Sequence, residues 1–504
     1  MAQYKHTEAA SGQGLFLSVN LSEQLIPGTF EYMMNDLIDN NTVDMSVFDE
    51  NYKNDQTGAK AIPPSALIKL IIFGYRQGVN TSRRLEELSK YNIVAKALAC
   101  DIEPHWTTIA DFISRNSEKF KKVFADILFY CAELGLVAGE TLACDGLRLP
   151  SNASKDMSGT EEELKKRLEI CRKMAGKHID KHRKLDEEGA MDEGIHRKFE
   201  DRQKRLNNKI GKISSFLQGM EKKEGKSGDE IKSNVTDNES AMIHSSKGYV
   251  QGYIGIAVTD KANQVIVTAE AIGSANEGEH LSDILDTTLE NLEAAGVKAP
   301  EEKPVTFLAD ANYWSEDNLR AFEEREVDAV IPDSQYGRRC GEGKERRYEA
   351  EDFTYHKEGD YYECPNGKKL EYKNKSTLGG KDGKVYKASV KDCRACPLSS
   401  RCIRSKKEKS KWDRGRQLLI TKSNEPGSLC SQMRKKLSTE EYQNKYSYRI
   451  QIVEPVFANI SYCKGLKRFT LRGKKKVNGQ WNLYCTVHNL GKCLEGYNER
   501  KRSA

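Results

Sequence analysis

The sequence has no uninterrupted apolar run long enough to cross a membrane. A transmembrane helix needs about 20 predominantly apolar residues, whereas charged residues make up 31% of this 504-residue chain and hydrophobic residues 38%. The first residues also lack the apolar core of a signal peptide. We therefore expect a soluble, cytoplasmic protein with no membrane partner. Channels and integral membrane transporters are excluded as function classes.

The sequence also lacks the cysteine pattern of a secreted disulfide scaffold. Its 13 cysteines are an odd number spread over a long chain, which indicates reduced thiols and at most a metal site. Six of them belong to residues 335–439, a polar and glycine-rich stretch with little apparent core of its own, and four of these six form a candidate site. Cys393 and Cys396 form a C-x2-C pair, with Cys364 before it and Cys402 after it. Four thiolates predict a tetrahedral Zn²⁺ site; reduced, unliganded thiols are the alternative.

Acidic residues are nearly missing from two basic segments. Arg401–Arg416 carries eight Lys and Arg against two acids, and Lys464–Lys476 carries seven with no acid. The net charge of the whole chain is only +6, so positive charge is concentrated near the C-terminal end. Such segments suit a polyanion, because phosphate contacts dominate nucleic-acid affinity. A solvated surface run is the alternative.

Acids also end two short apolar stretches, Glu140–Gly146 and Val305–Trp314. Each predicts a strand that presents a carboxylate, Asp145 or Asp310, at its end. A third acid, Glu454, lies in an apolar run far downstream. A single Asp is most often a helix cap or a solvated strand end. Three such acids together suit Mg²⁺, which takes a few carboxylates and leaves positions open for phosphate oxygens.

Residues 1–135, which precede Asp145, are predicted to be helical. Pro64 starts an apolar helix that Gly78 stops. Short capped helices fit a helix-turn-helix module, but periodicity alone does not separate this from a plain helical bundle. From Gly159 the chain becomes charged, with apolar residues at three-four spacing, which predicts an inserted helical hairpin. The hairpin is either an arm that touches DNA or another protomer, or a solvated coiled-coil spacer.

The middle of the chain predicts a mixed α/β sheet. Gly248–Val258 and Gln264–Ala269 are strand-rich and read as a hairpin that neighbours the Asp145 strand. An amphipathic helix, His280–Ala295, precedes the Asp310 strand, and a further strand is expected at Val327–Ile331. A later helix begins near Glu440 and carries Glu454, with Pro455 either starting or kinking it.

These residues resemble the DDE transposases of bacterial insertion sequences. The matching pieces occur in the expected order over nearly the whole chain: Cys144-Asp145-Gly146, Asn152-Ala153-Ser154, Leu308–Ser315, Tyr446–Phe457, Trp481-Asn482-Leu483 and His488-Asn489-Leu490. The resemblance implies an α/β fold with an RNase H-like mixed-sheet catalytic core, an all-α N-terminal domain, an inserted helical hairpin and a Cys-rich insertion. The expected domains are residues 1–135, helical and DNA-binding; 136–334, the first part of the core with the hairpin at about 159–232; 335–439, Cys-rich; and 440–504, the end of the core with a basic tail.

The resemblance also implies the chemistry. Asp145, Asp310 and Glu454 would be the catalytic triad, holding two Mg²⁺ or Mn²⁺ ions that cleave the element ends and transfer them to target DNA. The expected partners are double-stranded DNA, both terminal inverted repeats and target, and a second copy of the chain.

Five basic residues are candidates for DNA contact: Arg449, Lys464, Lys467, Arg468 and Arg472. Arg449 could instead orient the carboxylate of Glu454. Two other functions stay open at this point. One is a different RNase H-like nuclease, such as a repair or junction-resolving enzyme, and the other is a catalytically inactive DNA-binding derivative.

Overall fold

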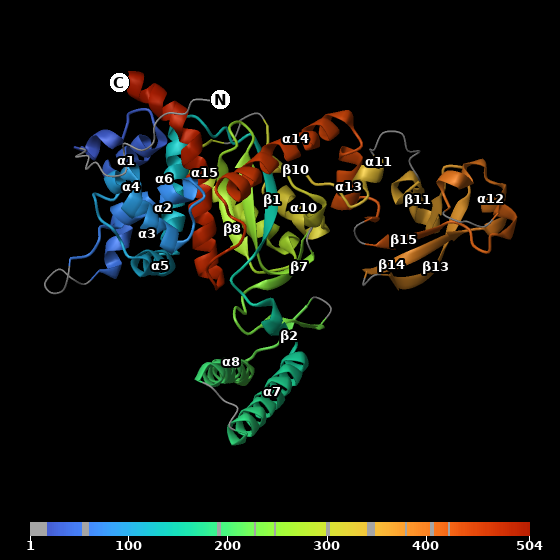
Figure 1. Ribbon diagram of the computed structural model, residues 1–504. Helices are drawn as coiled ribbons and strands as arrows, with labels where there is room; N and C mark the ends of the chain where they lie inside the picture. The colour runs from blue at the N-terminus through green and yellow to red at the C-terminus, as the bar shows by residue number, and fades with distance from the viewer. Residues whose placement is uncertain are drawn as a thin grey trace, which may run out of the picture. The chain divides into compact units, whose positions relative to one another are not determined.

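A computed structural model describes ten stretches of the chain. These are residues 18–52, 60–188, 193–225, 228–245, 248–298, 303–339, 348–378, 381–403, 408–421 and 424–503. The chain divides into two compact units (Figure 1). One comprises residues 1–115 with 494–504, and the other residues 116–493. No helix in the described stretches is long and apolar enough to cross a membrane.

The N-terminal unit is helical and is built around one buried helix. Its helices are α1 (Phe30–Asp39), α2 (Pro64–Arg76), α3 (Ser82–Tyr91), α4 (Ile93–Leu98) and α5 (Trp106–Arg115). Helix α2 begins at the proline that the sequence indicates, and every residue from Ala66 to Tyr75 is buried. Even Lys69 is buried, and its ammonium forms an ion pair with Asp39 at the end of α1.

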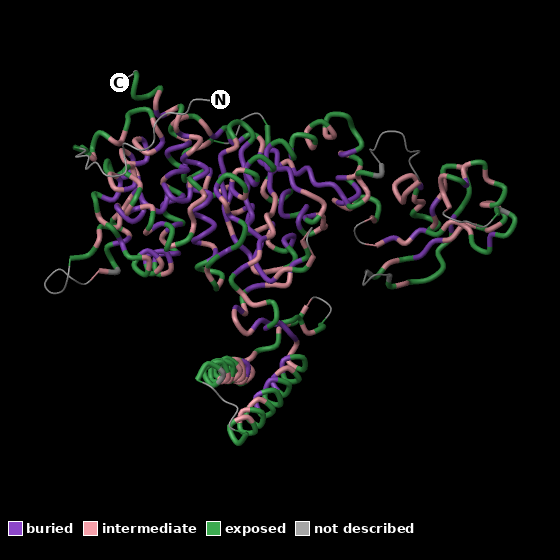
Figure 2. Tube along the Cα trace, in the orientation of Figure 1, coloured by how far each residue is buried: buried purple, intermediate pink, exposed green. Residues whose placement is uncertain are grey.

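The second unit contains a six-stranded mixed sheet. Its strands are β1 (Thr141–Pro150), β6 (Ala241–Ser245), β7 (Gly248–Asp260), β8 (Ile266–Ile272), β9 (Thr306–Leu308) and β10 (Asp328–Val330). The order is β10-β9-β1-β7-β6, and β8 also pairs with β7. Strands β7 and β8 form the predicted antiparallel hairpin and are almost entirely buried (Figure 2). The expectation of a mixed α/β sheet with an N-terminal helical region is confirmed.

The strand that carries Asp145 is longer than predicted. Asp145 lies in the middle of β1, opposite Ala257 of β7, and not at the strand end. The error arose because Gly146 suggested a turn, whereas β7 pairs with β1 as far as Pro150. The parallel pairing of β1 with β9 does stop at Ala143. Asp145 therefore lies just beyond the last residue of β1 that pairs with β9.

Helices cover the sheet and close its edge. They are α6 (Phe120–Glu133), α9 (Leu281–Ala294), α10 (Glu316–Glu324), α11 (Tyr336–Arg339), α13 (Leu429–Lys436), α14 (Glu440–Ala458) and α15 (Lys474–Ser503). The indole of Trp481 in α15 packs against Gly255 of β7, where a Cβ would lie 2.9 Å from the ring. Its Nε1 donates to the carbonyl of Ile256 at 2.8 Å. This close contact requires glycine at position 255.

Asparagines of α15 take the place of a further strand along β8. Asn489 accepts from the backbone N–H of Ile266 at 2.9 Å and donates to its carbonyl at 2.8 Å. Asn478 accepts from the N–H of Ala271 at 2.9 Å. Side-chain amides thus satisfy backbone groups that an edge strand would otherwise leave exposed.

Helix α14 continues past Pro455 without a break. The helix starts at Glu440, as the sequence indicates, so Pro455 does not mark its start. A proline inside a helix leaves the carbonyl four residues earlier without its usual partner. Here the side-chain amide of Gln264, from the β7–β8 turn, donates to that carbonyl, of Gln451, at 3.0 Å. A turn of π-helix, Asn459–Cys463, follows α14.

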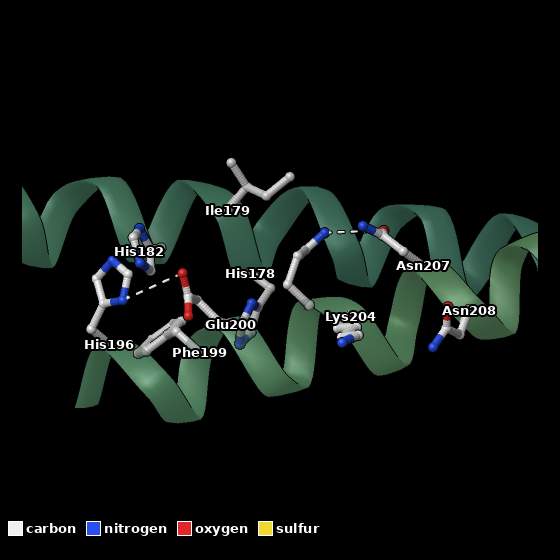
Figure 3. A pocket seen from close by; sticks show the side chains of 10 residues that line it. His178, Ile179, His182, His196, Phe199, Glu200, Lys204, Asn207 and Asn208 are labelled. Carbon is white, nitrogen blue, oxygen red and sulfur yellow. Dashed lines mark hydrogen bonds and ion pairs between the residues drawn. The ribbon is translucent and has the colours of Figure 1, made fainter. Parts of the chain in front are cut away.

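A helical hairpin is inserted after β1. Helices α7 (Glu161–Glu187) and α8 (Glu193–Gln218) pack side by side, and the small strands β2 (Ser158–Gly159) and β5 (Ser233–Asn234) pair at their base, next to β3 (Lys223–Glu224) and β4 (Glu230–Ile231). Near the tip, the rings of His182 and His196 lie 5.1 Å apart, and His178 contacts Phe199 (Figure 3). These aromatic contacts hold the two helices together where apolar residues are few.

The Cys-rich region forms a second sheet. Its strands are β11 (Thr354–His356), β12 (Tyr361–Glu363), β13 (Lys369–Leu378), β14 (Lys381–Ala388) and β15 (Gln417–Thr421), with helix α12 (Val390–Ala395). Its core is formed by Phe353, Tyr362, Leu370, Tyr386, Leu418 and Ile420. The stretch therefore has a core of its own, although a small one. Three of its six residues are aromatic.

Candidate active site

Asp145 is a partly buried carboxylate that is already paired. Its Oδ2 forms an ion pair with Nη2 of Arg449 at 2.8 Å, and its Oδ1 accepts from the N–H of Gly146 at 2.8 Å. Burial raises the pKa of Asp145, and the charge of Asp310 adds to this; the charge of Arg449 and the Gly146 hydrogen bond oppose it. The net pKa is above the usual range.

Asp310 follows β9 directly, and its backbone turns into a short 3-10 helix at Ala311–Tyr313. The N–H and the side-chain amide of Asn312 both donate to its carboxylate, at 2.9 Å each. This cap fixes the carboxylate at the end of β9, as the sequence predicts. Because β9 lies beside β1 in parallel register, the two aspartates lie close enough for each charge to act on the other.

Glu277 is a third carboxylate at this site that the sequence did not reveal. It lies in the 3-10 turn before α9 and is only 3% exposed. Nη2 of Arg148 pairs with it at 2.9 Å, and the amide of Asn312 donates to it at 3.0 Å. Burial raises its pKa, with further contributions from the charges of Asp310 and Asp145. Asn312 thus links Glu277 to Asp310.

The only sequence signal for Glu277 was its place just before a predicted helix. An acid there is usually a solvated helix-start residue, so periodicity gave no reason to expect burial. Gly146, which follows Asp145, is a better sign that a buried group lies nearby. A Cβ on Gly146 would lie 2.2 Å from Oε2 of Glu277 and 2.6 Å from Ile254. Glycine is required there because the Glu277 carboxylate occupies that space.

Helix α14 supplies the positive charge of the site. Arg449 is 9% exposed, and the charges of Asp145 and Asp310 both raise its pKa, although burial opposes them. Tyr446, one turn earlier, has its pKa raised by burial, and the same two aspartates contribute. Of the two roles open for Arg449, the structure shows a carboxylate contact, and the carboxylate belongs to Asp145.

Glu454 lies on the same helix but on another side of it. Five residues separate it from Arg449, which corresponds to about 140° around the helix. The buried face consists of Arg449, Ile452, Val453, Val456 and Phe457, and Glu454 is exposed. Among the described side chains, Glu454 makes no hydrogen bond with either aspartate. Its place in a triad stays a prediction.

The basic segment after α14 lies against the end of β1. The N–H of Phe469 donates to the carbonyl of Pro150 at 2.9 Å. Arg468 and Arg472 are exposed and donate to the backbone carbonyls of Ser151 and Asn152, at 3.1 and 2.9 Å. This places the cations next to the strand that carries Asp145.

The other two candidate cations of this segment differ in exposure. Lys467 is exposed, and its ammonium lies 3.6 Å from the centre of the Tyr462 ring. Lys464 is buried, and its ammonium donates to Asn459. The outward-facing cations are therefore Lys467, Arg468 and Arg472.

The donor set suits a hard cation. Asp145, Asp310 and Glu277 offer carboxylate oxygens, and the mutual repulsion of their charges would be relieved by a divalent ion. Within the described part of the chain, no three His, Cys, Asp or Glu side chains are already placed to hold a metal. Arg449 supplies the charge that balances Asp145 in this arrangement.

Two family models match the chain. A Transposase DDE domain matches residues 363–494, and a Transposase domain (DUF772) matches residues 19–115. The chain matches the DDE transposases of insertion sequences. Transposases of this family act on DNA and generally use divalent metal ions. The DDE match includes Arg449, Glu454 and the basic segment, whereas Asp145 and Asp310 lie before it. No curated relative matches the chain.

Proposed function

We propose that this chain is a DDE transposase that cleaves DNA at the ends of an insertion sequence and joins those ends to target DNA. The observation that carries the proposal is the placement of Asp145 and Asp310 on adjacent parallel strands. Both charges act on one arginine of α14. Asp145 lies in β1 just past the end of its parallel pairing with β9, and Asp310 follows β9, so the two carboxylates are neighbours as phosphodiester chemistry on an RNase H-like core needs.

Asp145, Asp310 and Glu454 are the proposed metal ligands. Bound Mg²⁺, as two ions or their Mn²⁺ equivalents, would activate water or a 3′-hydroxyl and stabilise the leaving oxygen. Glu277 holds the turn that carries Asp310 through Asn312. The charge of Arg449 opposes the rise in pKa that burial gives Asp145. Pro455 removes one backbone hydrogen bond beside Glu454, so this part of α14 can adjust more easily than a regular helix.

Lys467, Arg468 and Arg472 are the proposed phosphate contacts. Each arginine has five N–H donors, and the backbone carbonyls of residues 151–152 use only part of them. The segment would hold the DNA backbone beside β1, where Asp145 lies. Two ends must be brought together before transfer, so a homodimer on DNA is part of the proposal.

The test is strand cleavage of a DNA fragment that carries the sequences flanking this gene. With Mg²⁺ we expect nicks that map to the inverted-repeat ends, followed by joining to a second DNA molecule. Omission of the divalent ion should abolish cleavage and leave end binding.

Each alternative function has its own outcome in this assay. Cleavage that is indifferent to the ends would show a general RNase H-like nuclease. End binding without cleavage by the wild-type protein would show an inactive DNA-binding derivative. Either result would overturn the proposal.

A further inference from the structure

Four cysteines, Cys364 and three from the segment 393–402, line one small pocket of the second sheet. Cys364 follows β12, Cys393 lies in α12, and Cys396 and Cys402 bracket the short 3-10 helix Pro397–Arg401. All four line a single pocket of about 30 Å³. None of them is in a disulfide. The space is the size that one ion needs, and it is too small for an organic ligand.

The loop at Cys364 is shaped to present its sulfur. The N–H of Gly367 donates to the carbonyl of Cys364 at 2.8 Å, and Gly367 has a positive φ of 70°. This turn places the N–H of Lys368 3.3 Å from Sγ of Cys364. On the other side of the pocket, the N–H of Arg416 lies 3.4 Å from Sγ of Cys393. Backbone donors aimed at sulfur stabilise a thiolate and orient it as a ligand.

A metal role accounts for all four cysteines, because four thiolates that line one pocket need a compensating cation. A redox role would use only the C-x2-C pair.

The surrounding sheet would benefit from a cross-link. Its core has six buried residues, and Cys364 and Cys402 pack against it. The chain between β14 and β15 makes an excursion of 28 residues, which contains three of the four cysteines. A bound ion would tie this excursion to the β12–β13 turn. Small folds with a limited core gain stability from a structural metal in this way.

We propose that Cys364, Cys393, Cys396 and Cys402 bind one structural Zn²⁺ ion that joins the excursion to the sheet. Among the described residues, no three potential ligands are yet at metal-binding positions. The half-buried thiols must therefore turn toward the pocket when the ion binds. Zn²⁺ binding releases the thiol protons, so the complex forms more tightly as the pH rises.

The test is the zinc content of the full-length chain, expressed without a histidine tag and purified under reducing conditions. Mass spectrometry of the metal should find about one zinc per wild-type chain. The Cys393→Ser/Cys396→Ser variant should lose it. The matched control is Cys100→Ser/Cys463→Ser, which removes two exposed cysteines elsewhere and should keep the full content.

A second measurement covers the case in which the double variant does not fold. The wild-type chain, exchanged into Co²⁺, should show the intense visible spectrum of a tetrahedral thiolate site. The proposal is overturned if the folded wild-type chain contains no zinc and gives no such Co²⁺ spectrum. It is also overturned if the Cys393→Ser/Cys396→Ser variant retains the wild-type zinc content.

Discussion

At the scale of single residues, the site is a balance between one buried arginine and several carboxylates. Arg449 neutralises Asp145 directly at 2.8 Å and also feels the charge of Asp310. Without it, burial and the neighbouring acids would push Asp145 toward its protonated form. A protonated carboxyl group is a poor ligand for a divalent ion. Arg449 is thus a positioning residue that favours the ionised form of Asp145.

Replacement of this arginine should change the pH dependence of cleavage. The Arg449→Gln variant lacks this positive charge, which raises the pKa of Asp145. As the solution is acidified, Asp145 is therefore protonated at a higher pH than in the wild type. The acid limb of the pH–rate profile should move upward by about 1–3 pH units. Arg449→Lys should restore much of the original profile. Cleavage rates measured across the acidic range check this prediction.

Arg434→Gln is the control for general destabilisation. Arg434 is also a part-buried arginine and pairs with Asp333 at 2.7 Å, but its partner is not a carboxylate of the site. This variant should lose stability and keep the position of the acid limb. An acid limb that stays in place in Arg449→Gln would contradict the role given to Arg449.

The residues of the site differ in how far the sequence could predict them. Asp310 was predictable because an apolar strand and a turn surround it in sequence. The contact of Arg449 with Asp145 was not, because it depends on how α14 packs against β1. Glu277 was missed for the same reason: its burial results from Arg148, Asn312 and Tyr313, which come from two distant segments.

At the scale of elements, the packing of α15 against β8 explains several asparagines. A strand edge in a buried position must have its backbone groups paired. Asn489 provides both a donor and an acceptor to Ile266, and neither residue is exposed. The helix therefore recognises the strand through specific polar contacts in addition to apolar packing. This gives the His488-Asn489-Leu490 piece of the sequence a structural role.

Asn489→Leu should destabilise the unit formed by residues 116–493. Leucine has nearly the same size but leaves the N–H and carbonyl of Ile266 unpaired in a buried place. The free energy of unfolding should fall by roughly 2–4 kcal/mol, as measured by urea denaturation. Asn498→Leu, whose amide makes one exposed bond at 3.1 Å, should cost about 1 kcal/mol or less. Equal losses in the two variants would contradict this account of α15.

Elements whose apolar residues recur with a clear helix or strand period were predicted well, and elements without such a period were not. The β7–β8 hairpin and helix α9 lie close to their expected bounds because apolar residues there follow a strand or helix period. Helix α2 was located by Pro64 at its start and Gly78 after its end. The second sheet was missed because its strands are rich in charged residues, so their apolar alternation is weak. Its strands pair in chain order, but β15 follows β14 only after an excursion of 28 residues.

At the scale of the whole molecule, the chain brings acidic and basic segments together from both ends of one unit. The loop after β1 is held by Arg468 and Arg472, more than 300 positions later in the sequence. The sheet that carries Asp145 is thereby bordered by exposed cations. In the proposed function, this arrangement would place an anionic polymer next to the carboxylates, whose charge a divalent ion would shield. The cations and the carboxylates together form the proposed DNA-cleaving site.

The central claim is that Asp145, Asp310 and Glu454 act together in DNA cleavage. The most direct measurement is Mg²⁺-dependent nicking of end-bearing DNA by Asp145→Asn, Asp310→Asn and Glu454→Gln. The control is Glu441→Gln, an exposed acid on the same helix. Each of the three variants should lose at least about 100-fold in rate while binding the ends, and the control should cleave normally. Wild-type cleavage by any of the three would contradict the claim and remove that residue from the triad.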